Sequence, residues 1–181
     1  MPEQPAKGES KITSISKNKF LTLIIGVTVI LVLIGAGWYY FSQSSTERDA
    51  EKKLEAETGG KVNIEGDKVT IETDQGTVTT SKTQAPENFP SDVSIYKGAE
   101  ITGSTDAVDG VTLMLSTSDS VSQVSKFYQG DVKAKGWKIS ANSSLEGSAL
   151  LTAEKDKRSL LITISPDKST GKTSIAIVAS K

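Results

Sequence analysis

The stretch Ser120-Val-Ser-Gln-Val-Ser-Lys-Phe-Tyr-Gln-Gly-Asp-Val-Lys-Ala-Lys-Gly-Trp137 decides the fold of the C-terminal half of the chain. Its apolar residues recur every three or four positions and so share one face of a helix. Ser120 and Gln123 fit a capping box, and Gly136 is typical of a helix end. The stretch therefore predicts one amphipathic helix. The residues on its apolar face are Val121, Val124, Phe127, Tyr128 and Val132.

Segments on both sides of this helix alternate apolar and polar residues, as strands do. Two segments precede the helix and four follow it: 100–104, 111–116, 137–140, 149–154, 160–165 and 173–179. One helix on one face of an antiparallel sheet would bury all of these apolar stripes. We therefore predict an α+β domain over residues 91–181 with the order ββαββββ. Tyr128 and Trp137 are interpreted as packing residues of this domain.

Three further segments lead into this domain. Residues 61–80 alternate Val and Ile with polar residues and contain two turn signals, which predicts a small three-stranded β-meander. Residues 81–90 have the composition of a linker. Residues 42–60 are rich in helix formers and end at Gly59-Gly60, but they include few apolar side chains. We interpret 42–60 as a short, solvated stalk helix.

Residues 20–41 form an uncharged apolar segment. At ~1.5 Å per residue a helix of this length is roughly 33 Å long, which matches a ~30 Å hydrocarbon core. In lipid the backbone must satisfy its own hydrogen bonds, which favours a helix even for β-branched residues. The segment therefore predicts one transmembrane helix. Its expected interface residues are Lys17, Lys19, Trp38, Tyr39 and Tyr40.

The charges that flank this segment predict its orientation. Lys17 and Lys19 lie directly before it, whereas the first base after it, Arg48, is surrounded by acidic residues. The positive-inside rule then places the tail 1–19 in the cytoplasm and the C-terminal part outside the membrane. Two alternatives stay open. One is a cleaved signal peptide, although the apolar core is long for one. The other is a type IV pilin-like subunit, although the expected Gly and Glu are missing.

Composition excludes several kinds of site. The chain has 181 residues and contains neither cysteine nor histidine. A disulfide framework is therefore excluded, and a structural zinc site is excluded in practice. The commonest general base near neutral pH is missing as well. The net charge of −1 gives no electrostatic reason to expect nucleic acid as a partner.

Two motifs carry a resemblance. They are Pro90-Ser-Asp-Val-Ser-Ile-Tyr-Lys-Gly98 and, after the helix residues Phe127-Tyr128, Lys135-Gly136-Trp137. Together they resemble a C-terminal module of uncharacterised bacterial single-pass membrane-anchored proteins, over about half of the chain. The order of helix, Gly-Trp and meander is also similar to helix-grip domains of envelope lipoproteins of the outer-membrane assembly machinery. The resemblance implies a shared fold and location and names no site residue.

Candidate chemical motifs are explained better by turns or by chance. Residues 165–173 end in Gly-Lys-Thr, but a hairpin turn fits them better than a phosphate-binding loop. Ser94 and Lys97 match the Ser-x-x-Lys pattern of penicillin-recognising enzymes, whose other elements are missing. The pairs Asp106 with Asp109 and Asp67 with Asp74 lack the ligand series of a calcium loop. We therefore predict no catalytic, cofactor-binding or metal-binding residue.

These observations favour a non-enzymatic module that is anchored in the cell membrane and binds or scaffolds an envelope component. The expected partners are the lipid bilayer and an envelope protein or polymer, with no cofactor. The alternative is a cell-surface enzyme that uses Ser/Lys or carboxylates, and this requires a cleft with a strongly shifted titratable group.

Overall fold

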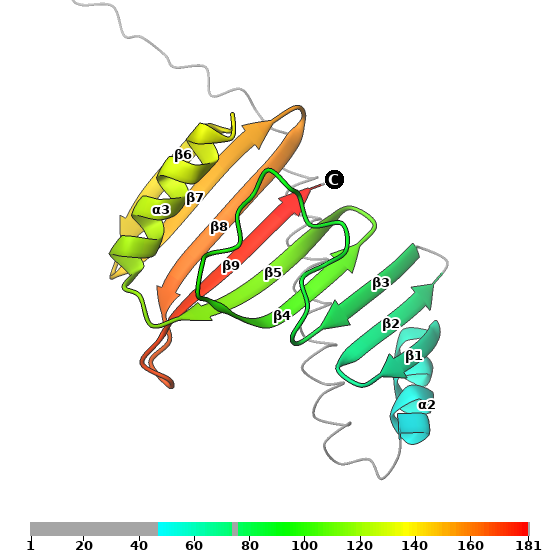
Figure 1. The fold of residues 1–181 in the computed structure, drawn as a ribbon. Coiled ribbons are helices and arrows are strands. Elements are labelled where there is room, and N and C mark those ends of the chain that lie inside the picture. The colour runs from blue at the N-terminus through cyan, green and yellow to red at the C-terminus, as the bar shows by residue number, and fades with distance from the viewer. Residues whose placement is uncertain (1–46, 74–75, 181) are drawn as a thin grey trace, which may run out of the picture. The chain divides into compact units, whose positions relative to one another are not determined.

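The computed structural model describes residues 47–73 and 76–180, which form one antiparallel sheet of nine strands and two helices (Figure 1). In chain order the elements are α2 (Glu47–Thr58), β1 (Lys61–Glu65), β2 (Lys68–Thr73), β3 (Gly76–Ser81), β4 (Glu100–Ala107), β5 (Gly110–Thr117), α3 (Val121–Ala134), β6 (Lys138–Leu145), β7 (Ser148–Lys155), β8 (Arg158–Pro166) and β9 (Thr173–Ser180). The predicted fold class, the three-stranded meander and the order ββαββββ are confirmed.

The strands lie in the order β1-β2-β3-β4-β5-β9-β8-β7-β6. The last strand, β9, returns to the middle of the sheet and pairs with β5, so that Leu113 lies opposite Ile177. Helix α3 therefore carries the chain from β5 to β6, the last strand at one end of the sheet. From there the hairpins β6–β7 and β7–β8 lead back toward β9.

Helix α3 begins and ends as its sequence predicts. The hydroxyl of Ser120 accepts a hydrogen bond from the Gln123 N–H, and the Gln123 side chain accepts one from the Ser120 N–H. These reciprocal bonds satisfy donors that the first helical turn leaves without partners. Gly136 follows the helix with a φ of +82°, a conformation that glycine adopts without a steric penalty. The buried residues of the helix are Val124, Tyr128 and Val132, all on the predicted face.

The main core lies between α3 and one face of the sheet. Alternate residues of β5, β7, β8 and β9 point into it. Strands β7, β8 and β9 show the period-two burial of a sheet with one covered face, whereas in β5 Thr112 on the other face is buried as well. The largest fully buried side chains of this core are Tyr128, Leu113, Leu115, Leu160, Ile162, Ile164, Ile175, Ile177, Val124 and Val132. Trp137 and Tyr128 are buried among these residues, as the sequence predicted.

Within the described part of residues 42–60, the packing of α2 corrects the interpretation as a solvated stalk. Ala50 and Leu54 are 0% and 3% exposed, because they pack against Val62 and Ile64 of β1. Two apolar residues one helical turn apart are enough to cover a strand as short as β1. Gly59 ends the helix as expected, with a φ of +68°.

Helix α2 covers the opposite face of the sheet from α3. Val69 of β2 packs against the buried residues of α2 and β1. A row of directly paired residues leads from it across the sheet, through Thr80 of β3 and Thr105 of β4 to Thr112 of β5. Directly paired residues lie on the same face of a sheet, and the neighbours of Thr112 in β5 point into the α3 core. The two helices therefore occupy different faces.

The chain between β3 and β4, residues 82–99, is here called the strap. It crosses the face of the sheet that α3 also covers (Figure 1). Val93 is buried in the main core, and Ala85, Phe89 and Tyr96 pack against it. Composition predicted a linker for 81–90. The structure shows that the connection is packed onto the domain along much of its length.

Several predictions fall on residues outside the described ranges. They are the tail 1–19, the membrane span 20–41 and the interface residues Lys17, Lys19, Trp38, Tyr39 and Tyr40. Within the described ranges, neither helix has the length and apolar character that a membrane crossing requires.

Candidate binding site beneath the strap

Asp92 fastens the middle of the strap to the hairpin between β7 and β8. Its carboxylate accepts two hydrogen bonds from the Arg158 guanidinium, at 3.0 and 2.6 Å, and one from the Lys155 ammonium at 2.8 Å. The backbone carbonyl of Asp92 accepts a hydrogen bond from the Trp137 indole at 2.9 Å. The Arg158 guanidinium also lies 5.0 Å from the centre of the Trp137 ring, within cation–π range.

This arrangement stabilises the ionised form of Asp92. The hydrogen bonds from Arg158 are the main cause, and those from Lys155 act in the same direction, so the pKa of Asp92 falls to about 2 although partial burial opposes the shift. A two-pronged Arg–carboxylate contact of this kind is among the stronger polar contacts in proteins. Asp92 therefore remains an anion at any physiological pH, and it holds the strap by charge.

A second polar cluster joins the strap to α3. Ser94 donates from its hydroxyl and its backbone N–H to the Asp131 carboxylate, at 2.9 and 3.3 Å. Lys135 donates from its ammonium to the Ser94 hydroxyl at 2.5 Å and lies 3.5 Å from Asp131. The Ser94 oxygen is thus fixed between an anion on one turn of the helix and a cation on the next.

A third contact lies at the start of α3. The Tyr96 hydroxyl donates to the Asp119 carboxylate at 2.7 Å, and this bond raises the pKa of Tyr96. The Tyr96 ring meets the Phe127 ring edge-on at 5.0 Å, and Phe127 meets Tyr128 in the same way at 5.1 Å. Edge-to-face contacts of this geometry are favourable. Three aromatic rings therefore close the space between strap and helix.

The Tyr128 hydroxyl lies beneath this cover without a hydrogen-bond partner. Tyr128 is 0% exposed, and its hydroxyl is the only buried side-chain polar atom in residues 47–73 and 76–180 that has none. Burial raises the pKa of Tyr128 well above its usual value, and the backbone N–H of Tyr96 lowers it in part without reaching hydrogen-bonding geometry. A buried hydroxyl without a partner costs about 1–3 kcal/mol. The molecule therefore keeps an unsatisfied donor inside its core.

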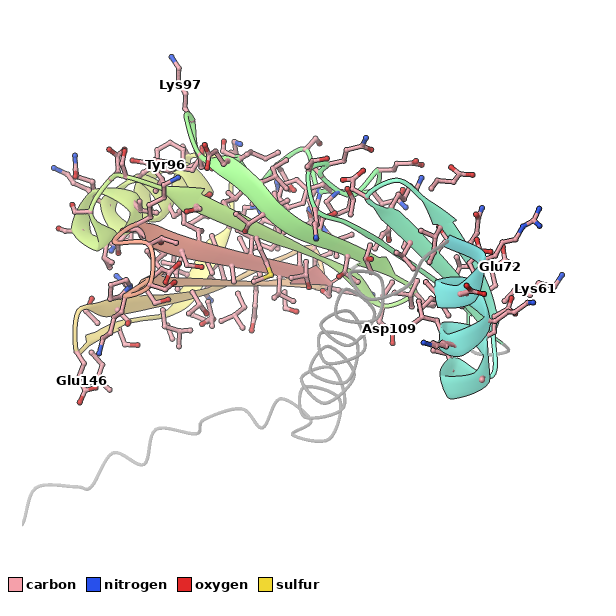
Figure 2. All side chains as sticks on the ribbon, turned by 90° about the horizontal axis from the view of Figure 1, so that it is seen from below. Lys61, Glu72, Tyr96, Lys97, Asp109 and Glu146 are labelled. Atoms are coloured by element: carbon pink, nitrogen blue, oxygen red, sulfur yellow. The ribbon has the colours of Figure 1, made fainter. Side chains whose placement is uncertain are left out.

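The structure separates the motifs that were singled out in the sequence. Ser94 meets Lys135 and not Lys97, whose side chain projects away from the fold (Figure 2). The Gly-Lys-Thr segment is a turn that leads into β9. In it Asp167 accepts hydrogen bonds from Ser169 and Thr170, and these lower the pKa of Asp167 to about 2.

The carboxylates of the described pairs accept hydrogen bonds from neighbouring side chains. Asp106 accepts a hydrogen bond from Asn88, and Asp67 accepts bonds from Ser81 and Thr83. No three acidic residues of the described ranges converge closely enough to hold a metal ion. Asp74, the expected partner of Asp67, lies outside these ranges.

Sequence reasoning missed the contacts of Asp92, Arg158 and Asp131. These residues are far apart in the chain: Arg158 follows Asp92 by 66 positions, and Asp131 follows Ser94 by 37. One signal was available, since Asp92 and Ser94 lie inside the motif on which the family resemblance rests. Each of these residues is also charged, and in a sequence such residues are read as surface positions.

Comparison with known families gives one match. The family model described as START domain-like matches residues 99–173, from the residue before β4 to the first residue of β9. The match covers less than half of the chain. No curated protein and no solved structure matches. Over the segment that holds α3 and the strands beneath it, the chain is similar to START domain-like proteins.

Proposed function

We propose that this chain is a single-pass membrane protein whose C-terminal domain binds an apolar molecule between the strap and α3 on the extracytoplasmic side. The unsatisfied Tyr128 hydroxyl carries the proposal, because a ligand with an apolar body and one hydrogen-bond acceptor would satisfy it. The similarity of residues 99–173 to START domain-like proteins supports a binding role for the part of the chain that holds α3 and Tyr128. The predicted span 20–41 would hold the domain beside the bilayer and raise its local concentration there.

The strap supports this proposal by the nature of its fastenings. Its central residues are held by polar contacts of three side chains, those of Asp92, Ser94 and Tyr96. Val93 is the strap residue that is buried in the core. Lifting this cover would break these polar contacts and withdraw Val93 and the Tyr96 ring from the core, but it would leave the strand pairing of the sheet intact. Such local openings cost less than global unfolding. The ligand would enter when the strap lifts.

The enzyme alternative rests on the contact between Ser94 and Lys135. A Ser/Lys hydrolase needs a neutral lysine that removes the serine proton. Here the Ser94 proton is donated to Asp131, and the Lys135 ammonium lies beside the same carboxylate. Both contacts favour a serine that fastens the strap. We therefore propose a binding module that carries out no covalent chemistry.

Tyr128→Phe tests the binding site. In membranes that contain the full chain, we expect a photoactivatable diazirine derivative of hexadecanol to label peptides of the strap and α3. Removing the hydroxyl should lower that labelling about three- to tenfold, which corresponds to one neutral hydrogen bond of about 1 kcal/mol. Quantitative mass spectrometry of the labelled peptides measures the change. Tyr40→Phe is the matched control, because it makes the same chemical change outside the described domain and should leave the labelling unaltered.

Two outcomes would contradict this binding site. One is labelling confined to residues 20–41, where any apolar probe dissolved in the bilayer would react. The other is equal labelling of strap peptides in the wild type and Tyr128→Phe.

A reporter fused after Lys181 tests the anchor and its direction. We expect alkaline phosphatase at this position to be active and a fluorescent protein to be dark, because the first folds outside the membrane and the second inside. Replacing both Lys17 and Lys19 by glutamate should lower the phosphatase activity several-fold, since these charges set the orientation. The same changes at Lys7 and Lys11, farther from the apolar segment, are the control. Equal effects of the two pairs would overturn the proposed orientation.

A further inference from the structure

The two ends of the nine-stranded sheet differ in how their backbone is satisfied. At one end, α2 lies beside β1, and two of its glutamates reach the edge of that strand. Glu55 accepts a hydrogen bond from the Val62 N–H at 3.3 Å, and Glu51 accepts one from the Ile64 N–H at 3.1 Å. Edge strands leave such groups ready to pair with another chain, and natural proteins block them. The β1 edge is therefore closed by side chains of its own chain.

The other end, β6, has no such cover among the described residues. No strand pairs with its outer side, and seven of its eight side chains are exposed, with Ile139 as the exception. The usual protective features are confined to its beginning, where Lys138 precedes an irregularity between Ile139 and Ala141. After that point the strand reads Ala141-Asn-Ser-Ser-Leu145, without charge or proline. This half of β6 is an open pairing edge.

Two exposed leucines lie at the same edge. Leu145 is 77% exposed and Leu150 is 38% exposed. Leu145 pairs with Ser148, and Leu150 pairs with Ser143. The positions 141, 143 and 145 of β6 share the face of Leu150, which is the face that α3 does not cover. Large apolar side chains left exposed beside an open edge favour a contact with another strand.

We infer that β6 pairs in antiparallel fashion with β6 of a second copy of this chain, with Ser143 on the twofold axis. In this register Leu145 of each copy lies opposite Ala141 of the other, and Asn142 lies opposite Ser144. On one face two apolar pairs flank the pair of Ser143 side chains, on the other face hydrogen-bonding residues meet, and no like charges face each other. A twofold contact requires this kind of self-complementary patch. This pairing of β6 does not require a ligand beneath the strap.

A single cysteine at Ser143 tests this pairing, because the natural chain contains none. In membranes that contain the full-length Ser143→Cys variant, mild oxidation should give a disulfide-linked dimer on a non-reducing gel. The matched control is Asn63→Cys, an exposed position on the closed β1 edge, which should remain mostly monomeric. Dimer formation at position 143 that does not exceed that of the control would overturn the inference.

A charge exchange separates specific pairing from random collision. In the Ser143→Cys background, Leu145→Lys should lower the dimer fraction several-fold, because lysine replaces the apolar contact with Ala141 of the partner strand. Adding Ala141→Glu should restore it, since each Lys then faces a Glu across the axis. Both side chains are exposed, so the fold of each copy should be unaffected. The inference would also be overturned if Leu145→Lys left the dimer fraction unchanged, or if adding Ala141→Glu failed to restore it.

Discussion

Replacing Asp92 by asparagine is expected to lower the free energy of unfolding by about 2 kcal/mol and to loosen the strap. The substitution leaves the Arg158 guanidinium and the Lys155 ammonium without their shared anion. Breaking a fully buried ion pair costs about 3–5 kcal/mol, and these side chains keep about a quarter of their exposure, which reduces the effect. Denaturant titration of the full chain, followed by Trp137 fluorescence in a Trp38→Phe background, measures the change.

Asp109→Asn is the matched control for this prediction. Asp109 is an exposed carboxylate in the turn between β4 and β5 (Figure 2), and its replacement should change stability by less than about 0.5 kcal/mol. Trp137 is a suitable reporter because its indole donates to the backbone of Asp92. If Asp92→Asn and Asp109→Asn had the same effect, the cluster around Asp92 would not fasten the strap.

The contacts of Asp92 also predict that the stability of the domain depends on pH. The pKa of Asp92 is lowered from 3.8 to about 2 in the folded chain. A lowered pKa means that the contribution to stability is fully present above pH ~4 and is lost as the pH falls through about 2. For a partly exposed group this contribution is about 1–2 kcal/mol. Asp167 also has a pKa of about 2 and is retained in both chains, so the difference between wild type and Asp92→Asn isolates Asp92. That difference should shrink below pH ~3.

The order of elements could be predicted because each depends on residues close together in the chain. Val124, Tyr128 and Val132 mark the buried face of α3 by their spacing alone, and Ser120 with Gln123 marks its beginning. Strands β7, β8 and β9 alternate buried residues with less buried ones almost without exception. Local period and local capping are visible in one sequence, and here they were sufficient.

The candidate site could not be predicted, because it depends on contacts between distant residues. Nothing beside Asp92 in the chain indicates that Arg158 and Lys155 will lie against it, since these bases occupy the β7–β8 hairpin. The packing of α2 escaped prediction for a related reason. The two apolar residues that it buries, Ala50 and Leu54, are too few to show a face, and their partners lie on the following strand. In both cases the three-dimensional partner decides the role of an ordinary residue.

Trp137→Ala is expected to destabilise the domain by about 3–5 kcal/mol, the range for removing a large buried aromatic side chain. The indole is 3% exposed, and it joins three parts of the fold: the end of α3, the strap through the Asp92 carbonyl, and β8 through Arg158. Its loss would leave a cavity and would remove a contact from the cluster around Asp92. Thermal unfolding of the full chain, followed by circular dichroism, measures the effect without a fluorescent probe.

Trp137→Phe separates the two parts of this effect. Phenylalanine keeps an aromatic ring under Arg158 but has no N–H for the Asp92 carbonyl, so the expected loss is smaller, about 1–3 kcal/mol. If the phenylalanine variant were as unstable as the alanine variant, the hydrogen bond to the strap would outweigh the packing. If it were as stable as the wild type, the indole N–H would contribute nothing to holding the strap. An intermediate value would mean that Trp137 acts in both ways, as a core side chain and as the point where the strap is joined to the core.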